Sequence, residues 1–269
     1  MVNVLIFAPN GGGKGTQCGI LQKKYGMTHC ESGALFRANI KGGTALGSAA
    51  KAFIDKGQLV PDSITIPMML NRLKEDDCKN GWLLDGFPRT EAQAKALVEA
   101  LAVEGITLDY VIELDLDRSI AKERLTGRRV CAVDPNHPNH TAFPALMPVK
   151  GADGSLACRV CGGALSQRKD DADDSAIEQR HDIYYKDTVA AINYFKSNSS
   201  GGWKFVSVDG SRDIAEVTAS ILAELNVPSS GSSGASSLPL SAVAPWAILA
   251  VGAALLFVLP SGKIAAPSK

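Results

Sequence analysis

Short runs of apolar residues recur along the chain and alternate with segments of helical periodicity. The mainly apolar runs cover residues 2–8, 82–84, 110–114 and 203–208. Between them, segments such as 91–103 and 119–125 repeat apolar side chains three and four residues apart. Short buried strands that alternate with helices predict βαβ units, and therefore an α/β fold built on a parallel sheet. In such sheets ligands bind at the carboxyl ends of the strands.

Two stretches depart from this alternation. Residues 131–165 contain four prolines and many glycines without a helical period, which predicts an inserted subdomain of loops and short strands. Residues 228–237 consist almost entirely of Ser and Gly, the composition of a flexible linker. We therefore expect the globular unit to end at Val227.

Composition and charge exclude several classes of protein. The chain has 269 residues, of which 45% are hydrophobic, so it is not a disordered chain. Basic and acidic residues number 28 each, and Lys263 and Lys269 are the only charged residues after Glu224, which leaves residues 1–227 slightly acidic. Without a basic field, we expect no nucleic-acid partner.

The first apolar run lacks the basic residues that open a secretory signal, and a Gly-rich turn follows it. We expect a cytoplasmic catalytic domain with reduced cysteines. Cys18, Cys30 and Cys78 fall in or beside core elements and are interpreted as small buried hydrophobic residues.

A Gly-rich loop between the first strand and the first helix predicts phosphate binding. Glycines let consecutive backbone N–H groups converge on phosphate oxygens, and the helix offers its positive N-terminus. The sequence departs twice from the general P-loop pattern, because Ala8 replaces the first Gly and Gly15 separates Lys14 from Thr16. The predicted cradle comprises Gly11, Gly12, Gly13, Lys14, Gly15 and Thr16.

This variant loop is the first of six motifs in a fixed order. The others are residues 31–37 (ESGALFR), 57–62 (GQLVPD), 85–90 (DGFPRT), 127–129 (GRR) and 168–171 (RKDD). Together they closely resemble adenylate kinase over residues 1–227. The resemblance implies a P-loop nucleoside monophosphate kinase fold that transfers a phosphoryl group reversibly from Mg-ATP to AMP and gives two ADP. It also implies a monomer whose partners are its substrates, ATP, AMP and ADP.

The resemblance divides the chain into functional parts. The core covers residues 1–30, 73–127 and 172–227, an AMP-binding insert covers 31–72, and a lid covers 128–171. Transfer between two polyanions requires cations that neutralise both, and arginine binds phosphate through a planar fork. The implied catalytic residues are Lys14, Asp85, Arg89, Arg124, Arg128, Arg168 and Arg180.

The two nucleotide sites follow by the same resemblance. The ATP site consists of the phosphate loop with Arg128 and Arg212, while Asp85 and Thr16 hold Mg²⁺ through water. No general base is needed, because the AMP phosphate oxygen is already an anion. The implied AMP site comprises Ser32, Arg37, Gln58, Leu59, Val60, Gly86, Phe87, Pro88, Arg89, Gln93, Arg168 and Arg180, with the Gln93 amide facing the purine.

Three alternative functions remain open from the sequence. Relatives that use GTP, or that act on other nucleoside monophosphates, share most of these motifs. Ala8 at the first P-loop position raises the alternative of a catalytically weak adenine-nucleotide sensor. A regulatory GTPase is disfavoured because the chain lacks an Asn-Lys-x-Asp string.

Four residues of the lid have the spacing of a metal site. Cys131, His137, Cys158 and Cys161 give C-x₅-H-x₂₀-C-x₂-C, which is typical of a tetrahedral Cys₃His zinc centre and resembles the long-lid adenylate kinases. Such a site would be structural, and iron or cobalt could replace zinc. His140 is an alternative ligand, and free thiols or a Cys158–Cys161 disulfide are the alternatives to a metal.

Residues 242–259 are apolar and uncharged, and a short basic tail, 260–269, follows them. The segment is just long enough to span a bilayer, although its many alanines weaken insertion. The leading hypothesis is a membrane anchor behind the linker at 228–241. The alternatives are a segment folded onto a protein surface and a GPI signal, which would require an export signal.

Overall fold

The computed structural model describes residues 2–56, 58–151, 154–198 and 201–226. Five parallel strands form its central sheet in the order β2-β3-β1-β4-β9. These strands are β1 (Val4–Phe7), β2 (Thr28–Glu31), β3 (Trp82–Asp85), β4 (Tyr110–Asp115) and β9 (Lys204–Asp209). Each of the four apolar runs forms a strand, so the predicted α/β fold with a parallel sheet is confirmed.

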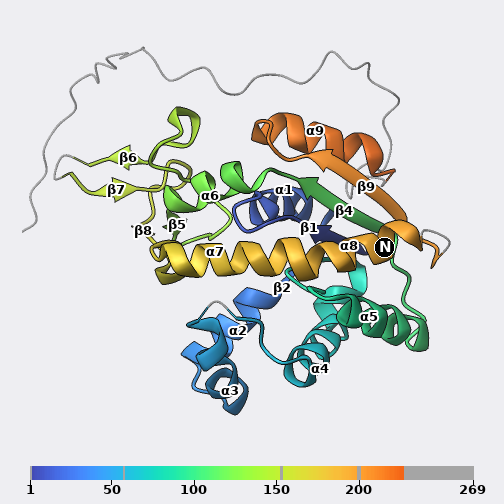
Figure 1. Ribbon diagram of the computed structural model, residues 1–269. Coiled ribbons are helices and arrows are strands. Elements are labelled where there is room, and N and C mark those ends of the chain that lie inside the picture. The colour runs from blue at the N-terminus through green and yellow to red at the C-terminus, as the bar shows by residue number, and fades with distance from the viewer. Residues whose placement is uncertain (1, 57, 152–153, 199–200, 227–269) are drawn as a thin grey trace, which may run out of the picture. The chain divides into compact units, whose positions relative to one another are not determined.

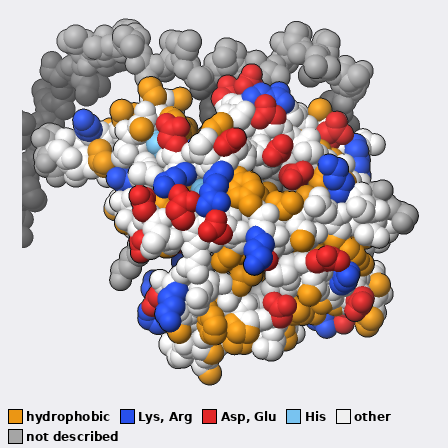
Figure 2. Space-filling model, in the orientation of Figure 1, with side chains coloured by type: hydrophobic (Ala, Val, Ile, Leu, Met, Phe, Trp, Pro, Cys, Tyr) orange, Lys and Arg blue, Asp and Glu red, His pale blue; other side chains and the backbone are white. Residues whose placement is uncertain are grey.

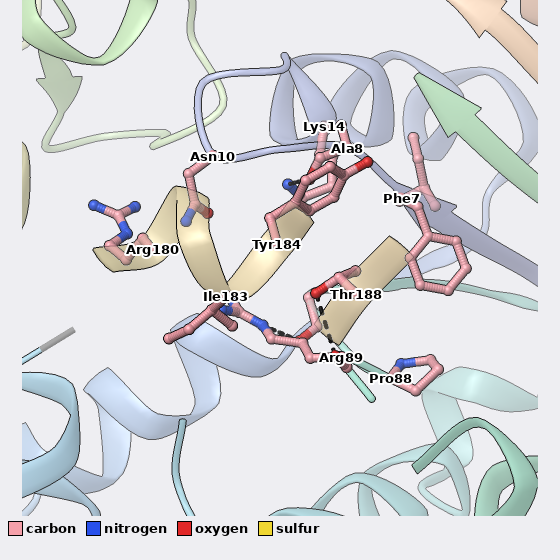
Figure 3. Close-up of a pocket in the computed structure, with 12 residues that line it drawn as sticks. Phe7, Ala8, Asn10, Lys14, Pro88, Arg89, Arg180, Ile183, Tyr184 and Thr188 are labelled. Atoms are coloured by element: carbon pink, nitrogen blue, oxygen red, sulfur yellow. Dashed lines mark hydrogen bonds between the residues drawn. The ribbon is translucent and has the colours of Figure 1, made fainter. Parts of the chain in front are cut away.

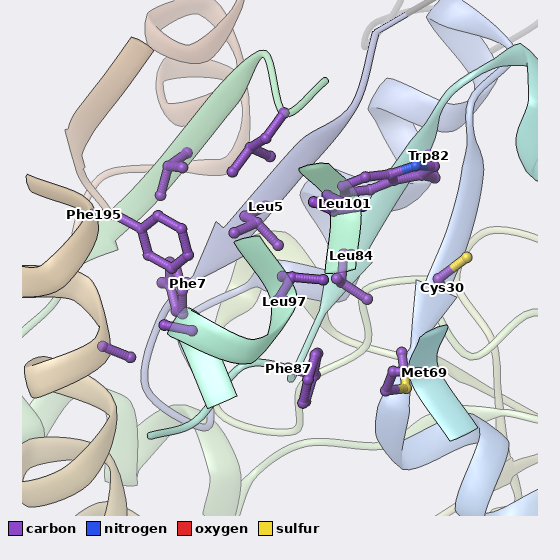
Figure 4. Packing of buried hydrophobic residues seen from close by; sticks show 14 of the residues in the cluster. Leu5, Phe7, Cys30, Met69, Trp82, Leu84, Phe87, Leu97, Leu101 and Phe195 are labelled. Carbon is purple, nitrogen blue, oxygen red and sulfur yellow. The ribbon is translucent and has the colours of Figure 1, made fainter. Parts of the chain in front are cut away.

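The sheet is buried on both faces, and β1 contributes side chains to the core on each face. Leu5 and Phe7 pack on one face with Leu97 and Phe195, as Figure 4 shows. Val4 and Ile6 face the opposite way and join a second cluster. Because successive side chains of a strand point to opposite faces, a strand buried on both faces is a continuous apolar run.

Helices cover the two faces of the sheet. α1 (Lys14–Tyr25) and α9 (Ile214–Glu224) contribute to one core cluster, and α5 (Glu91–Val103) and α8 (Val189–Ser197) contribute to the other (Figure 1). α5 begins and ends at the predicted residues. Its first turn is capped by the Thr90 hydroxyl, which accepts a hydrogen bond from the Gln93 N–H.

The edge strand β2 was missed in the sequence analysis. Its residues are Thr28, His29, Cys30 and Glu31, and only Cys30 is fully buried. An edge strand with one buried side chain has no apolar run to reveal it. β2 nevertheless pairs along its whole length with β3, so that Glu31 lies beside Asp85 at the carboxyl end of the sheet.

The predicted AMP-binding insert contains three helices, α2 (Ser32–Lys41), α3 (Ala45–Ile54) and α4 (Asp62–Leu73). Phe36, Ala50 and Val60 form a small core of their own. Met69 and Leu73 of α4 belong instead to the main core. α4 therefore connects the insert to the sheet domain, while α2 and α3 pack mainly on each other.

The predicted lid follows α6 (Arg118–Thr126) and precedes α7 (Asp174–Ile183). It consists of two small antiparallel ribbons, as the prolines and glycines predict. The ribbons pair β5 (Val130–Cys131) with β8 (Leu165–Ser166) and β6 (Val149–Lys150) with β7 (Leu156–Ala157). The remaining helical elements of the described residues are short. They are η1 (Asp76–Asn80), η2 (Pro144–Leu146), η3 (Lys169–Asp171) and η4 (Tyr184–Thr188). η4 joins α7 to α8.

The surface agrees with the balanced charge of the sequence. Lys, Arg, Asp and Glu side chains are interspersed on the face drawn in Figure 2. Within the described ranges, no helix has the length and apolarity needed to cross a membrane. The candidate membrane segment at 242–259 and its flanking residues lie outside the described residues.

Candidate active site

A cavity lies at the carboxyl ends of the central strands, between the loop after β1 and the helices α7 and η4 (Figure 3). Lys14, Arg89 and Arg180 line it, together with Gly86 and Pro88. Ile6, Phe7, Ala8, Asn10, Ile183, Tyr184 and Thr188 complete the wall. The cavity therefore brings residues of the first and fourth sequence motifs together with residues of α7 and η4.

The predicted phosphate loop has the backbone geometry that a cradle requires. Gly11 and Gly13 have φ values of +92° and +84°, which strongly favour glycine. A Cβ atom on Gly11 would also lie 2.2 Å from the Ala121 carbonyl oxygen, so α6 packs directly against the loop. α1 begins at Lys14 and directs its N-terminus at the loop.

The Lys14 ammonium is held inside the loop. Its Nζ donates a hydrogen bond to the Ala8 carbonyl at 2.7 Å and another to the Pro9 carbonyl at 3.3 Å. Burial lowers the pKa of Lys14, while the carboxylate of Asp85 acts in the opposite direction. The cation is thus kept by nearby oxygens in a site that favours the arrival of an anion.

Asp85 is the last residue of β3 and is buried beside this ammonium. Burial would raise the pKa of its carboxyl group, but the His29 imidazole and the charge of Lys14 lower it overall. His29 Nε2 lies 3.5 Å from Asp85 Oδ2. A buried carboxylate that stays ionised at the end of a strand suits a hard divalent cation.

Arg89 and Arg180 both line the cavity and come from different parts of the fold, the loop after β3 and α7 (Figure 3). Arg89 Nε donates to the Gly86 carbonyl at 2.8 Å. Burial lowers the pKa of the Arg89 guanidinium, and the positive charge of Arg180 lowers it further. A guanidinium whose charge is destabilised by burial and by a neighbouring arginine marks a site where a phosphate would be stabilising.

Asp171 connects the lid arginine to α7. Arg128 binds the buried Asp171 carboxylate through its Nε and a terminal nitrogen, each at 2.8 Å, and Arg180 reaches the same carboxylate at 3.1 Å. Arg168 has its pKa lowered by burial and then by the charges of Arg128 and Arg37. The structure thus brings the predicted arginines 37, 89, 128, 168 and 180 into one electrostatic cluster.

The predicted acceptor site adjoins this cluster. Ser32 Oγ donates to the Gly86 carbonyl at 2.8 Å, and Arg37 binds Glu31 at 2.7 Å. The Gln93 amide accepts from the Arg89 N–H at 2.7 Å and donates to Asp62 at 2.6 Å. Among the remaining predicted acceptor residues, Val60 and Phe87 are buried, Leu59 is half-buried and Gln58 is exposed.

Arg124 and Arg212 lie apart from the cavity, at the end of β9. The Arg124 guanidinium donates to the carbonyls of Gly210 and Ser211 at 2.7 and 2.9 Å. Arg212 binds Asp209 at 3.2 Å. Neither side chain lines the cavity around Lys14, so a role at the ATP site would lie at its outer, nucleoside end.

The four predicted metal ligands of the lid come together. The donor atoms of Cys131, His137, Cys158 and Cys161 all lie within 4.8 Å of one another. Asn139 Nδ2 donates to the Cys158 thiol at 3.3 Å. Burial would raise the pKa of Cys158, but this hydrogen bond and those from backbone N–H groups lower it to about 6.

The cluster also has the surroundings of a metal centre. His137 Nδ1 faces Cys158 Sγ at 3.6 Å, and its Nε2 lies 3.5 Å from Asp134, which can orient the ring. The rival ligand His140 is engaged elsewhere, because its Nδ1 accepts from the Ala142 N–H and its Nε2 lies 3.2 Å from the Glu123 carbonyl. The donor set fits zinc.

Sequence analysis missed one residue that supports the loop. His181 on α7 is fully buried and lies with Nε2 3.0 Å from the Asn10 carbonyl, which places it as the donor to that oxygen. It thereby connects α7 to the phosphate loop. A histidine in the middle of a polar helix carries no sequence signal for such a contact, because its partner is distant in the chain.

Comparisons with known proteins agree with this geometry. The adenylate kinase family model matches residues 6–200. The adenylate kinase of Desulfotalea psychrophila is 60% identical over 226 residues, which cover 83% of this chain and 99% of that protein. Those of Desulforapulum autotrophicum and Desulfosudis oleivorans are 52% and 51% identical, each over 83% of this chain and 100% of their own length.

The chain belongs to the adenylate kinase family. It is an enzyme that transfers a phosphoryl group from Mg-ATP to AMP. The resemblance drawn from the six motifs is confirmed, as are the fold and the reaction. The matched length leaves the C-terminal segment outside these adenylate kinases.

Substitution of Gly86 tests the close packing of the acceptor site. Gly86 has φ +77°, and a Cβ atom there would lie 2.7 Å from Ser32 Oγ. We expect Gly86→Ala to lower kcat/KM for AMP by about 100-fold, since small displacements of positioning groups have effects of that order.

Gly105→Ala is the matched control. Gly105 also has positive φ, at +65°, but no atom lies within 4 Å of its added Cβ. Both variants carry backbone strain of about 1–2 kcal/mol, so only Gly86→Ala should lose activity. Steady-state ADP formation measures this, and equal activities of the two variants would contradict the assignment.

Proposed function

We propose that the cavity is where the two phosphate chains meet, with ATP on the loop after β1 and AMP between β3 and α2. The observation that supports this most directly is that Lys14, Arg89 and Arg180 line one cavity next to the ionised Asp85. Positive charges from three parts of the chain surround this space, and the phosphate groups of bound nucleotides would neutralise them.

The donor side is assigned to the phosphate loop. Backbone N–H groups of residues 11–16 bind the ATP phosphates, and Lys14 moves from the Ala8 carbonyl toward the transferred group. Asp85 and Thr16 would hold Mg²⁺, which when bound would supply positive charge to the phosphate oxygens. Arg124 and Arg212 belong to the outer part of this site, near the carbonyls at the end of β9.

The acceptor side is assigned to the surroundings of Gly86. Arg37 and Arg89 bind the AMP phosphate, and Ser32, the backbone of residues 58–60 and Gln93 surround the nucleoside. Since Gln93 is hydrogen-bonded to Arg89 and Asp62, its amide must exchange a partner to read the purine. Selectivity for ATP over GTP, and for AMP over UMP or CMP, is part of the proposal, and competition assays with these nucleotides would test it.

Lid closure supplies the remaining arginines. Arg128 and Arg168 flank the lid, and Arg128 is already oriented by Asp171. We propose that closure brings both toward the phosphates and excludes water, as lids of phosphotransferases do. The nucleophile is the anionic AMP phosphate oxygen, so this step needs no general base.

Arg89→Lys tests whether transfer at the cavity needs the shape of the Arg89 guanidinium or only its positive charge. Lysine keeps the positive charge but loses the planar fork, and loss of one positioned donor costs about 100- to 1,000-fold in kcat. We expect a decrease of that size in ADP formation at saturating ATP and AMP.

Arg159→Lys is the control, because Arg159 is exposed on the lid. It should retain activity within twofold of the original protein. If Arg89→Lys kept comparable activity, the cavity would not be the place of transfer.

We propose that the lid cluster binds one structural zinc ion, with iron or cobalt as substitutes. The ion would fasten β5 and β8 to the loop that carries Cys158, in a segment with little apolar core of its own. The purified protein should contain about one metal per chain by mass spectrometry, and Cys161→Ser should contain none. Cys78→Ser, outside the lid, should retain it.

Metal removal should also lower the melting temperature. A ligand present at 1,000 times its dissociation constant contributes about 4 kcal/mol, and each kcal/mol corresponds to roughly 2–4 °C in a domain of this size. We expect a fall of about 10 °C on chelation. A metal-free protein with unchanged melting would contradict a structural role.

For residues 242–259 we propose a membrane anchor that places the catalytic domain at the cytoplasmic side. The support is compositional, an uncharged apolar segment between a Ser/Gly linker and Lys263. The full chain should stay in the membrane pellet after alkaline carbonate extraction, and a chain ending at Val227 should not. If both were extracted, the segment would be a docking segment instead.

A further inference from the structure

A second cluster of metal-binding side chains lies behind the proposed magnesium carboxylate. Cys18 comes from α1, His29 from β2 and Asp85 from β3. One donor atom from each residue lies within 4.8 Å of the other two. The cluster is separate from the lid centre and shares only Asp85 with the proposed active site.

The histidine of this cluster has an unused ring nitrogen. The His29 side chain is only 9% exposed, and its Nε2 is one of two buried side-chain nitrogen or oxygen atoms in the described ranges without a hydrogen-bond partner. This atom faces Asp85 Oδ2 at 3.5 Å, too far for a good hydrogen bond. An imidazole with an unpartnered buried nitrogen, gathered with a carboxylate and a thiol, offers three donor groups that metal ions bind.

We propose that Cys18, His29 and Asp85 form a binding site for a zinc-class ion that competes with the magnesium function of Asp85. Thiolate, imidazole and carboxylate together favour Zn²⁺ over Mg²⁺, which prefers oxygen ligands. Tetrahedral zinc holds its ligand atoms roughly 3.3–3.8 Å apart, given its usual bond lengths. The cluster therefore needs to contract by about 1.5 Å at most, and the fourth position remains for water.

Zinc binding at this site replaces the thiol proton of Cys18 and the contact of Asp85 with Mg²⁺. The ion binds the Cys18 sulfur with loss of the thiol proton to solvent, and takes one oxygen of the Asp85 carboxylate. Asp85 then no longer serves Mg²⁺, so that phosphoryl transfer slows. The neighbouring Lys14 charge opposes the ion, but its ammonium is directed at the Ala8 and Pro9 carbonyls. The inhibitory part of the proposal rests on the proposed role of Asp85, whereas the binding site itself does not.

The test measures zinc binding and inhibition separately. The full chain, with its lid metal already loaded, is titrated with zinc from a metal buffer, and bound zinc is counted after equilibrium dialysis. We expect one further zinc per chain in the original protein and none in Cys18→Ala. Cys78→Ala removes a buried cysteine elsewhere and should retain the further zinc.

Inhibition is followed as ADP formation at fixed Mg²⁺ and nucleotide, with free zinc varied. Half-inhibition of the original protein and of Cys78→Ala should need at least tenfold less free zinc than that of Cys18→Ala. Cobalt offers a spectroscopic check, because the thiolate-to-cobalt absorption should increase on the second equivalent in the original protein and in Cys78→Ala, but not in Cys18→Ala. If Cys18→Ala does not fold, His29→Gln takes its place.

Three results decide the proposal. Equal zinc content in the original protein and the Cys18 and His29 variants would overturn the site. A further zinc that requires Cys18 and inhibits the enzyme would support the whole proposal. A further zinc that requires Cys18 but leaves activity unchanged would establish the site and overturn the competition, which would count against Asp85 as the magnesium carboxylate.

Discussion

Positive charges that lie close together govern this active site. Burial lowers the pKa of Arg89 and the charge of Arg180 lowers it further, while the pKa of Arg168 is lowered by burial and then by the charges of Arg128 and Arg37. Few carboxylates are close enough to offset these charges, and the two that are buried, Asp85 and Asp171, are already paired. The fold therefore keeps an electrostatic deficit. Under the proposed function, nucleotide phosphates remove this deficit on binding, which would make substrate affinity and lid closure parts of one process.

The parallel sheet makes such a concentration of charge structurally tolerable. Its two core clusters bury every side chain of β1, so the strand ends are held rigidly while the loops beyond them carry the polar groups. Asp171 then links the lid to α7 by binding Arg128 and Arg180 at once. Movement of the lid is thereby coupled to an arginine of the cavity without any direct contact between the two arginines.

The sequence predicts the parts of this molecule whose signals are local. Apolar runs predicted four of the five strands of the central sheet. The glycine loop predicted the phosphate-binding residues, and the C-x-x-C pair predicted the metal ligands of the lid. β2, by contrast, has one fully buried side chain among four mostly polar residues, so no apolar run predicts it. The positions of Arg124, His29 and His181 depend on carbonyls or carboxylates at least 56 residues away in the chain. Such contacts follow from how the strands are ordered, which periodicity alone does not give.

The missed strand matters most at Asp85. β2 pairs with β3 in a register that places His29 opposite Leu83, two residues before Asp85. Strand pairing therefore delivers an imidazole to the carboxylate, while α1 delivers Lys14 to its other side. The imidazole and the ammonium lower the pKa of Asp85 against the effect of burial. An ionised carboxylate in a dry site is costly unless such partners are fixed beside it. The same partners leave His29 Nε2 unsatisfied, so keeping Asp85 ionised also makes this place attractive to a softer cation.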